Sequence, residues 1–168
     1  MIDLKEITNK IATKNNLYCL SVILIIFFLD RYTKLLVLNN FSENIFFLND
    51  YINLDLVWNT GIGFGLFSSN SNLIYNLTSL LIVIVIICLI YFLIRSEKYE
   101  KIVYSIIVGG ALGNFYDRII YKAVPDFIDL HYNNYHWFIF NFADLFITFG
   151  IIGYLLKDFF YKGDNEKI

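Results

Sequence analysis

The amino-acid sequence predicts an all-α polytopic membrane protein with four transmembrane helices and a small extracytoplasmic β cradle. Hydrophobic residues make up 58% of the 168-residue chain, which contains a single proline. The apolar residues gather into four runs, each close to the roughly 20 residues that a helix needs to cross a bilayer. We therefore expect one membrane-embedded domain over residues 1–168, with helices at about 17–38, 73–94, 102–120 and 138–160.

The four runs differ in the charged residues that they contain. The second carries none, whereas the first is broken by Asp30, Arg31 and Lys34 and the third by Asp117 and Arg118. The first run follows three lysines, as in a secretory signal, but no small-residue cleavage site precedes Asp30. This pattern favours an uncleaved membrane anchor.

The distribution of lysine and arginine predicts the orientation of the chain. These residues lie before the first run, between the second and third runs, and in the C-terminal tail, whereas the connection 39–72 has none. By the positive-inside rule, both termini are cytoplasmic and the connections 39–72 and 121–137 face outward. The net charge is −2 and no basic groove indicates nucleic-acid binding.

The two outer connections carry strand signals. From Tyr51 onward apolar and polar residues alternate, which is typical of a half-buried strand. A stretch with glycines at positions 61, 63 and 65 follows, and we interpret it as an adaptable flap over the site. Asn133-Asn134, flanked by aromatic residues, predicts a hairpin in the second connection.

Two aspartates are the main candidates for chemistry. Asp144 lies within the fourth apolar run and Asp126 directly follows Pro125 at the outer face. A carboxylate at membrane depth indicates function by default, because burying an unpaired charge there is costly. Two nearby carboxylates share one proton, so that one serves as general base and the other as general acid. The reaction class that follows is amide hydrolysis without a covalent intermediate.

Neighbouring polar residues are placed to support this pair. Asn114, Asp117 and Arg118 share one sector of the third helix, and Asn141 and Asp144 share one face of the fourth. Asp144 could instead pair with Arg118 or with Arg31 only to assemble the helices.

Other chemistries remain open. A metal site is conceivable because Asp126, Asp129, His131 and His136 are close in sequence, but no metal-binding motif is present. Cys19 and Cys88, both in apolar runs, are interpreted as buried small hydrophobic residues. A small proton- or ion-coupled transporter would use Asp30, Asp126 and Asp144 as relay carboxylates, and an assembly scaffold would need neither aspartate.

Five segments, taken together and in order, resemble the lipoprotein signal peptidase (signal peptidase II) family. They are Asp30-Arg31-Tyr32-Thr33-Lys34, the segment 59–65 (NTGIGFG), the segment 109–118 (GGALGNFYDR), Val124-Pro125-Asp126-Phe127-Ile128, and Phe140-Asn141-Phe142-Ala143-Asp144. Three positions depart from the usual pattern, namely Arg31, Gly63 and Pro125, and none of these changes removes a carboxylate of the pair.

The resemblance implies an intramembrane aspartic endopeptidase of the bacterial cytoplasmic membrane, with its site toward the outer face. It would remove the signal peptide from a diacylglyceryl-modified prolipoprotein by cutting before the lipidated cysteine, within membrane lipid and without metal or cofactor. It would be inhibited by globomycin. The implied catalytic residues are Asp126 and Asp144. The implied supporting or substrate-binding residues are Asp30, Lys34, Asn59, Gly61, Asn114, Asp117, Arg118, Asn141 and Ala143.

Overall fold

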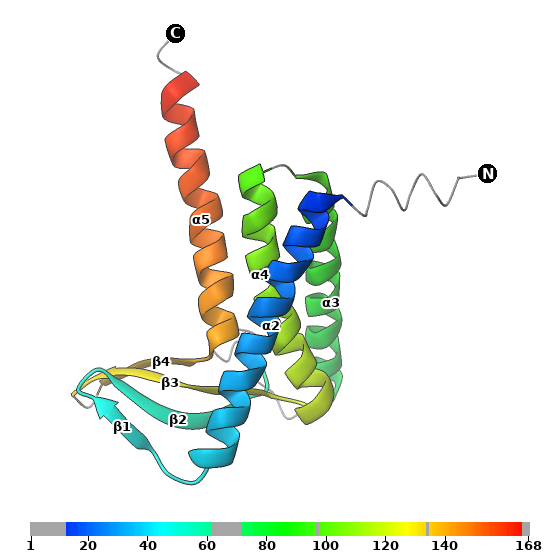
Figure 1. Cartoon of the computed structure of the whole chain (residues 1–168). Helices are drawn as coiled ribbons and strands as arrows, with labels where there is room; N and C mark the ends of the chain where they lie inside the picture. The colour runs from blue at the N-terminus through cyan, green and yellow to red at the C-terminus, as the bar shows by residue number, and fades with distance from the viewer. Residues whose placement is uncertain (1–12, 62–71, 97, 134, 166–168) are drawn as a thin grey trace.

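A computed structural model describes residues 13–61, 72–96, 98–133 and 135–165. Over these residues it contains four helices and one four-stranded sheet (Figure 1). In chain order the elements are α2 (Lys14–Asn40), β1 (Phe46–Asn49), β2 (Ile52–Asn59), α3 (Asn72–Arg95), α4 (Lys98–Tyr121), β3 (Val124–Tyr132), β4 (Tyr135–Phe140) and α5 (Phe142–Asn165). The sheet lies at one end of the helices, opposite the start of α2 and the end of α5 (Figure 1).

The sheet is antiparallel throughout, in the order β1-β2-β3-β4. The side chain of Asn49 tightens the turn between β1 and β2, because its Oδ1 accepts the backbone N–H groups of Tyr51 and Ile52. Asn133, at the end of β3, has a φ of 51°, a left-handed conformation that asparagine tolerates. Its predicted hairpin partner Asn134 lies outside the described residues, as do Gly63 and Gly65 of the expected flap.

Helix α4 is the centre of the helical layer and packs against α2, α3 and α5. Two glycines permit this close packing. A Cβ on Gly113 would collide with the Asp30 carboxylate on α2, and one on Gly110 would lie 2.6 Å from the carbonyl oxygen of Ala143 on α5. The glycine faces of α4 therefore bring Asp30 and the start of α5 close to the middle of the molecule.

The fourth helix begins at Phe142, later than the position 138 expected from the sequence. Residues 138–140 are apolar and would suit a helix, but they belong to β4, where Phe138 pairs with Leu130 and Phe140 with Ile128. Long-range strand pairing with β3 therefore takes these residues from the helix. As a result Asp144 lies in the first turn of α5 and not deep within it.

The polarity of the helical layer is inverted relative to that of a water-soluble protein. Large apolar side chains are exposed along the outer faces of the helices, including Phe28, Ile87 and Leu155, whereas Asp30, Lys34 and Asp117 are fully buried. Among the described helices, one segment, Tyr75–Arg95, is long and apolar enough by composition to cross a membrane. Cys19 is buried as expected, but Cys88 is exposed on α3 because the face that carries it has no helix against it.

Candidate active site

Asp126 and Asp144 come from different elements and meet where the sheet joins the helices. Asp126 lies in β3 and is 3% exposed, and Asp144 lies in the first turn of α5. Asn141, between β4 and α5, contacts both carboxylates. Its Nδ2 donates to Asp126 Oδ1 at 2.6 Å, and its backbone N–H donates to Asp144 Oδ2 at 3.2 Å. One asparagine therefore holds the two carboxylates beside each other.

The start of α5 explains why Asp144 has a fixed position. The backbone N–H of Asp144 donates to Asn141 Oδ1 at 3.1 Å, while the Asp144 carboxylate accepts the backbone N–H of Asn141. This reciprocal arrangement is a capping box, which satisfies N–H groups that have no partner within the helix. The positive end of the helix dipole also favours a negative charge at this position.

Asparagine amides satisfy the remaining carboxylate oxygens of the pair. Asn59, at the end of β2, donates through Nδ2 to Asp126 Oδ2 at 2.9 Å. Asn114 of α4 donates through Nδ2 to Asp144 Oδ1 at 2.8 Å. Asn141 Nδ2 also donates to Asn114 Oδ1 at 3.1 Å, which links the two halves of the site. Each of the four carboxylate oxygens thus accepts a hydrogen bond from a neutral donor.

A buried charged cluster lies beside this asparagine frame. The Lys34 ammonium donates to Asp30 Oδ2 at 2.8 Å, to Asp117 Oδ2 at 2.6 Å and to Asn114 Oδ1 at 2.9 Å. Arg31 pairs with the other oxygen of Asp117. Asp30 Oδ1 accepts the backbone N–H of Ala143 at 3.0 Å, so the cluster also holds the first turn of α5. Two acids and two bases balance in formal charge here.

Arg118 occupies the opposite side of Asn114. Its guanidinium donates to the backbone carbonyl of Asn114 at 3.1 Å and to the carbonyl of Gly61. Gly61 is in turn held by Asn59, whose Oδ1 accepts its N–H at 2.9 Å. Tyr75 of α3 donates its hydroxyl to the carbonyl of Arg118. Arg118 therefore joins α4 to the end of β2, and its hydrogen bonds go to backbone carbonyls and not to a carboxylate.

The electrostatics of Asp126 differ from those of an ordinary aspartate. Burial above all, and the neighbouring charge of Asp144, raise the pKa of its carboxyl from 3.8 to about 7, against the hydrogen bonds from Asn59 and Asn141, which lower that pKa. At neutral pH this carboxyl is therefore poised between its protonated and ionised forms. A pair with one proton available can supply an acid and a base at the same time.

A cavity of about 440 Å³ leads to Asp144. Its walls come from α3 and α5 and its floor from α4, and most of its lining is aliphatic. Asn114, Arg118 and Asp144 are the polar and charged residues at one end. The apolar residues that line it include Leu81, Val85, Leu89, Ile107, Ala111, Ile147 and Ile151. The cavity can therefore accept an apolar segment with a polar bond at the aspartate pair.

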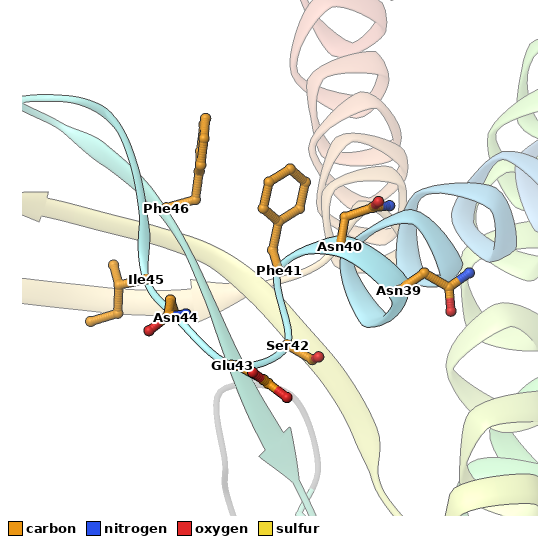
Figure 2. A pocket seen from close by; sticks show the side chains of 8 residues that line it. All are labelled: Asn39, Asn40, Phe41, Ser42, Glu43, Asn44, Ile45 and Phe46. Atoms are coloured by element: carbon orange, nitrogen blue, oxygen red, sulfur yellow. The ribbon is translucent and has the colours of Figure 1, made fainter.

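A second hollow, also of about 440 Å³, lies in the connection between α2 and β1 (Figure 2). Eight consecutive residues, 39–46, form it, and they include none of the predicted site residues. Within it the rings of Phe41 and Phe46 are 4.9 Å apart. We assign it no part in the chemistry.

The structure separates Asp126 from the other members of the hypothetical metal site. Asp129 follows Asp126 by three residues on β3, so the two side chains point to opposite faces of the sheet. Asp129 contacts His136 Nδ1 at 2.8 and 2.9 Å, and the rings of His131 and His136 stack at 5.4 Å. Among the described residues, no group of three or more histidine, cysteine or acidic side chains is placed to hold a metal ion.

Sequence reasoning named the members of the site but missed three links between them. It did not anticipate that Lys34 contacts Asn114, that Tyr75 binds the Arg118 carbonyl, or that Arg31 pairs with Asp117 and not with Asp144. Within the charged cluster, helical spacing could have suggested the contact between Lys34 and Asp30, which are four residues apart. Ala143 lies in the packing between α4 and α5, fully buried.

Comparisons with known proteins show the family of the chain and a matching fold. A family model described as signal peptidase (SPase) II matches residues 22–160. The lipoprotein signal peptidase of Pelagibacter ubique is 46% identical over 165 residues, covering 95% of this chain and 99% of that protein. The lipoprotein signal peptidase of Francisella tularensis subsp. novicida is 35% identical over 160 residues, covering 92% and 98%.

Solved structures of bacterial membrane enzymes are similar as well. One, obtained by the in meso method at 2.3 Å, superposes with a TM-score of 0.76 at 26% identity and covers 90% of this chain and 92% of that one. Another, at 1.9 Å, has a TM-score of 0.70 at 26% identity and covers 83% and 91%. The fold and these comparisons together define the class as a membrane enzyme that acts as a hydrolase. The match over residues 22–160 and the identity with the relatives place the chain in the signal peptidase II family.

Proposed function

We propose that this chain removes the signal peptide from diacylglyceryl-modified prolipoproteins by cutting before the lipidated cysteine, with Asp126 and Asp144 as the catalytic pair. The observation that carries the proposal is that Asn141 pairs the buried Asp126 carboxylate with the half-buried Asp144 carboxylate, which lies at the polar end of an apolar cavity. The relatives named lipoprotein signal peptidase support the substrate class. The comparisons give no support to the transporter alternative.

The proposed reaction uses the one proton that the pair shares. The ionised carboxylate takes a proton from water as the water oxygen attacks the scissile carbonyl carbon, and the protonated carboxyl donates to the carbonyl oxygen. When the tetrahedral intermediate collapses, the C–N bond breaks. One proton passes to the amine of the lipidated cysteine and another returns from the intermediate to the pair. The signal peptide leaves with a carboxylate, and no covalent bond to the enzyme forms.

The supporting residues have distinct proposed tasks. Asn59, Asn114 and Asn141 orient the carboxylates through hydrogen bonds. Arg118 and Gly61 position the end of β2, where a substrate backbone would enter. Because these donors are neutral amides, they hold the pair without removing its ability to gain and lose a proton.

The placement of the site suits a substrate that arrives from lipid. We propose that all four helices span the bacterial cytoplasmic membrane, with both termini cytoplasmic and the sheet at the outer face. The charges of α2 and α4 are compatible with this, because Lys34 and Arg31 together balance Asp30 and Asp117 inside the bundle. The signal peptide would lie in the apolar cavity between α3 and α5. The family resemblance also leads us to expect inhibition by globomycin.

The test uses the purified chain in detergent with a diacylglyceryl-modified prolipoprotein, in the presence of a metal chelator. We expect two products by mass spectrometry, one beginning at the lipidated cysteine and the other ending at the residue before it. A matched prolipoprotein without the diacylglycerol should be cut far more slowly. Absence of cleavage, or cleavage only after metal is restored, would overturn the proposal.

A further inference from the structure

Among the described residues, Lys34 is the one buried cation with a hydrogen bond to an asparagine side chain of the frame, whereas Arg118, also buried, contacts the backbone carbonyl of Asn114. Lys34 is 0% exposed, and its ammonium has three N–H donors that are all used, toward Asp30, Asp117 and Asn114. Two of these partners are acids that neutralise it. The third, Asn114, is neutral and belongs to the site. A lysine that served only to pair charges would not need this third contact.

The contact with Asn114 fixes which end of its amide faces Asp144. An ammonium can only donate, so Asn114 must present its oxygen to Lys34. The amide nitrogen then points away from Lys34 and donates to Asp144 Oδ1. If the amide turned over, its oxygen would face the oxygen of Asp144 and two N–H groups would face a cation. Lys34 therefore excludes the reversed orientation.

The same oxygen transmits the constraint to the second aspartate. Asn114 Oδ1 accepts from Lys34 at 2.9 Å and from Asn141 Nδ2 at 3.1 Å, and the Asn141 amide also donates to Asp126 Oδ1 at 2.6 Å. The amides of Asn114 and Asn141, which donate to the two carboxylates, are thus both fixed through Asn114 Oδ1, and Lys34 holds this oxygen in place.

We propose that Lys34 is a positioning residue for hydrolysis, which acts through Asn114 and Asn141 to aim the donors at Asp144 and Asp126. This inference rests on the proposed catalytic pair. Lys34 contacts neither carboxylate of the pair. In this proposal it keeps the two carboxylates in reactive geometry and supplies a fixed positive charge close to them. A small displacement of Lys34 would disturb the hydrogen bonds that run through Asn114 and Asn141 to the two carboxylates.

The test compares the steady-state kinetics of Lys34→Met with those of Arg31→Gln. Methionine fills similar space but cannot donate, so Asn114 loses its anchor. We expect kcat to fall about ten- to a hundred-fold with little change in KM, because misorientation affects the chemical step more than substrate binding. The upper limb of the pH profile should also move to higher pH, since the positive charge of Lys34 lowers the pKa of Asp126.

Arg31→Gln is the matched control in the same cluster. It removes a charge that pairs with Asp117 but leaves the hydrogen bonds from Lys34 to Asn114 and to Asp117 in place. We expect its kcat and pH profile to stay within about twofold of wild type. If Lys34→Met does not fold, Asp30→Asn with Lys34→Met removes an opposite pair of charges, keeps the buried cluster neutral and still lacks the donor to Asn114.

The outcomes separate the two proposals. If folded Lys34→Met, or the double variant, has the kcat and pH profile of wild type and differs only in melting temperature, Lys34 is structural and the inference is wrong. If Asp144→Asn, assayed alongside, cleaves normally, the catalytic pair itself is wrong. Both proposals are supported if Asp144→Asn loses activity and the Lys34 variant has a lowered kcat and an alkaline limb of the pH profile at higher pH.

Discussion

At the scale of one residue, the fold gives Asp126 the environment that the proposed catalytic pair requires. The side chain is nearly fully buried, its two oxygens accept hydrogen bonds only from amides, and a second carboxylate lies beside it. Burial without a cation in direct contact favours the protonated form. An aspartate that would be fully ionised in water at neutral pH therefore retains a share of the proton here.

This environment predicts the pH dependence of the reaction. The pKa of Asp126 is raised to about 7, so above that pH the pair loses its shared proton and no acid remains for the scissile carbonyl. We expect kcat/KM to fall by about tenfold for each pH unit on the alkaline side. A stopped assay across the pH range measures this fall in kcat/KM. Asp50→Asn, which changes an exposed residue, is the control and should show the same alkaline fall as wild type. A rate that stays constant to about pH 9 would contradict the shared proton.

The sequence was sufficient to name the candidate site residues, which the structure brings together, but not to predict most of the contacts among them. Asp126 and Asp144 stand out because carboxylates are costly in apolar segments. The bond from Lys34 to Asn114 depends on how α2 and α4 rotate against each other, and no local pattern records that rotation. The pairing of Arg31 with Asp117 is unpredictable for the same reason.

At the scale of elements, the glycines of α4 determine how closely the helices carrying the site approach. Gly113 faces Asp30 and Gly110 faces the carbonyl of Ala143. Gly109, four residues before Gly113, lies against Ile26 of α2, so small residues at this spacing line the same helix contact. The start of α5 was not predictable, because a short apolar run such as residues 138–140 is compatible with both a strand and a helix.

Gly113→Ala tests the role of this close approach. The added methyl group would press on the Asp30 carboxylate, which holds both Lys34 and the first turn of α5. We expect a loss of about 1–3 kcal/mol in the free energy of unfolding in detergent, together with lower activity.

Gly153→Ala is the matched control for that measurement, since its methyl group would meet only the Tyr99 hydroxyl at 3.2 Å and Val103 at 3.8 Å. It should be neutral or slightly stabilising, because alanine favours a helix over glycine. Equal effects of the two substitutions would show that the packing at Gly113 has no special importance.

At the scale of the whole molecule, the inverted polarity suits helices surrounded by lipid, with the sheet at one end of them. Exposed apolar side chains cover the outer faces of the helices, and the charges lie inside or at the ends. The sheet and the aspartate pair lie together at the end of the helices opposite the start of α2 (Figure 1). The four-helix and sheet architecture was predicted from composition and alternation, whereas the orientation stays a prediction from the lysine and arginine distribution.

Cysteine labelling in spheroplasts measures that orientation. In a background with Cys19→Ala and Cys88→Ala, Asp50→Cys places a thiol on the exposed turn of the sheet and Asn15→Cys places one at the exposed start of α2. We expect a membrane-impermeant maleimide to label the first before lysis and the second only after it. Labelling in the opposite order would reverse the assigned topology. Both must react in lysed cells.

The central claim is that Asp126 and Asp144 act as one catalytic pair. The most direct measurement is the single-turnover rate of lipidated prolipoprotein cleavage by Asp126→Asn and by Asp144→Asn, with chelator present and melting temperatures recorded. We expect each variant to lose at least about a hundredfold in rate while remaining folded, because each lacks one half of the acid and base function. Cleavage near the wild-type rate by either folded variant would contradict the account.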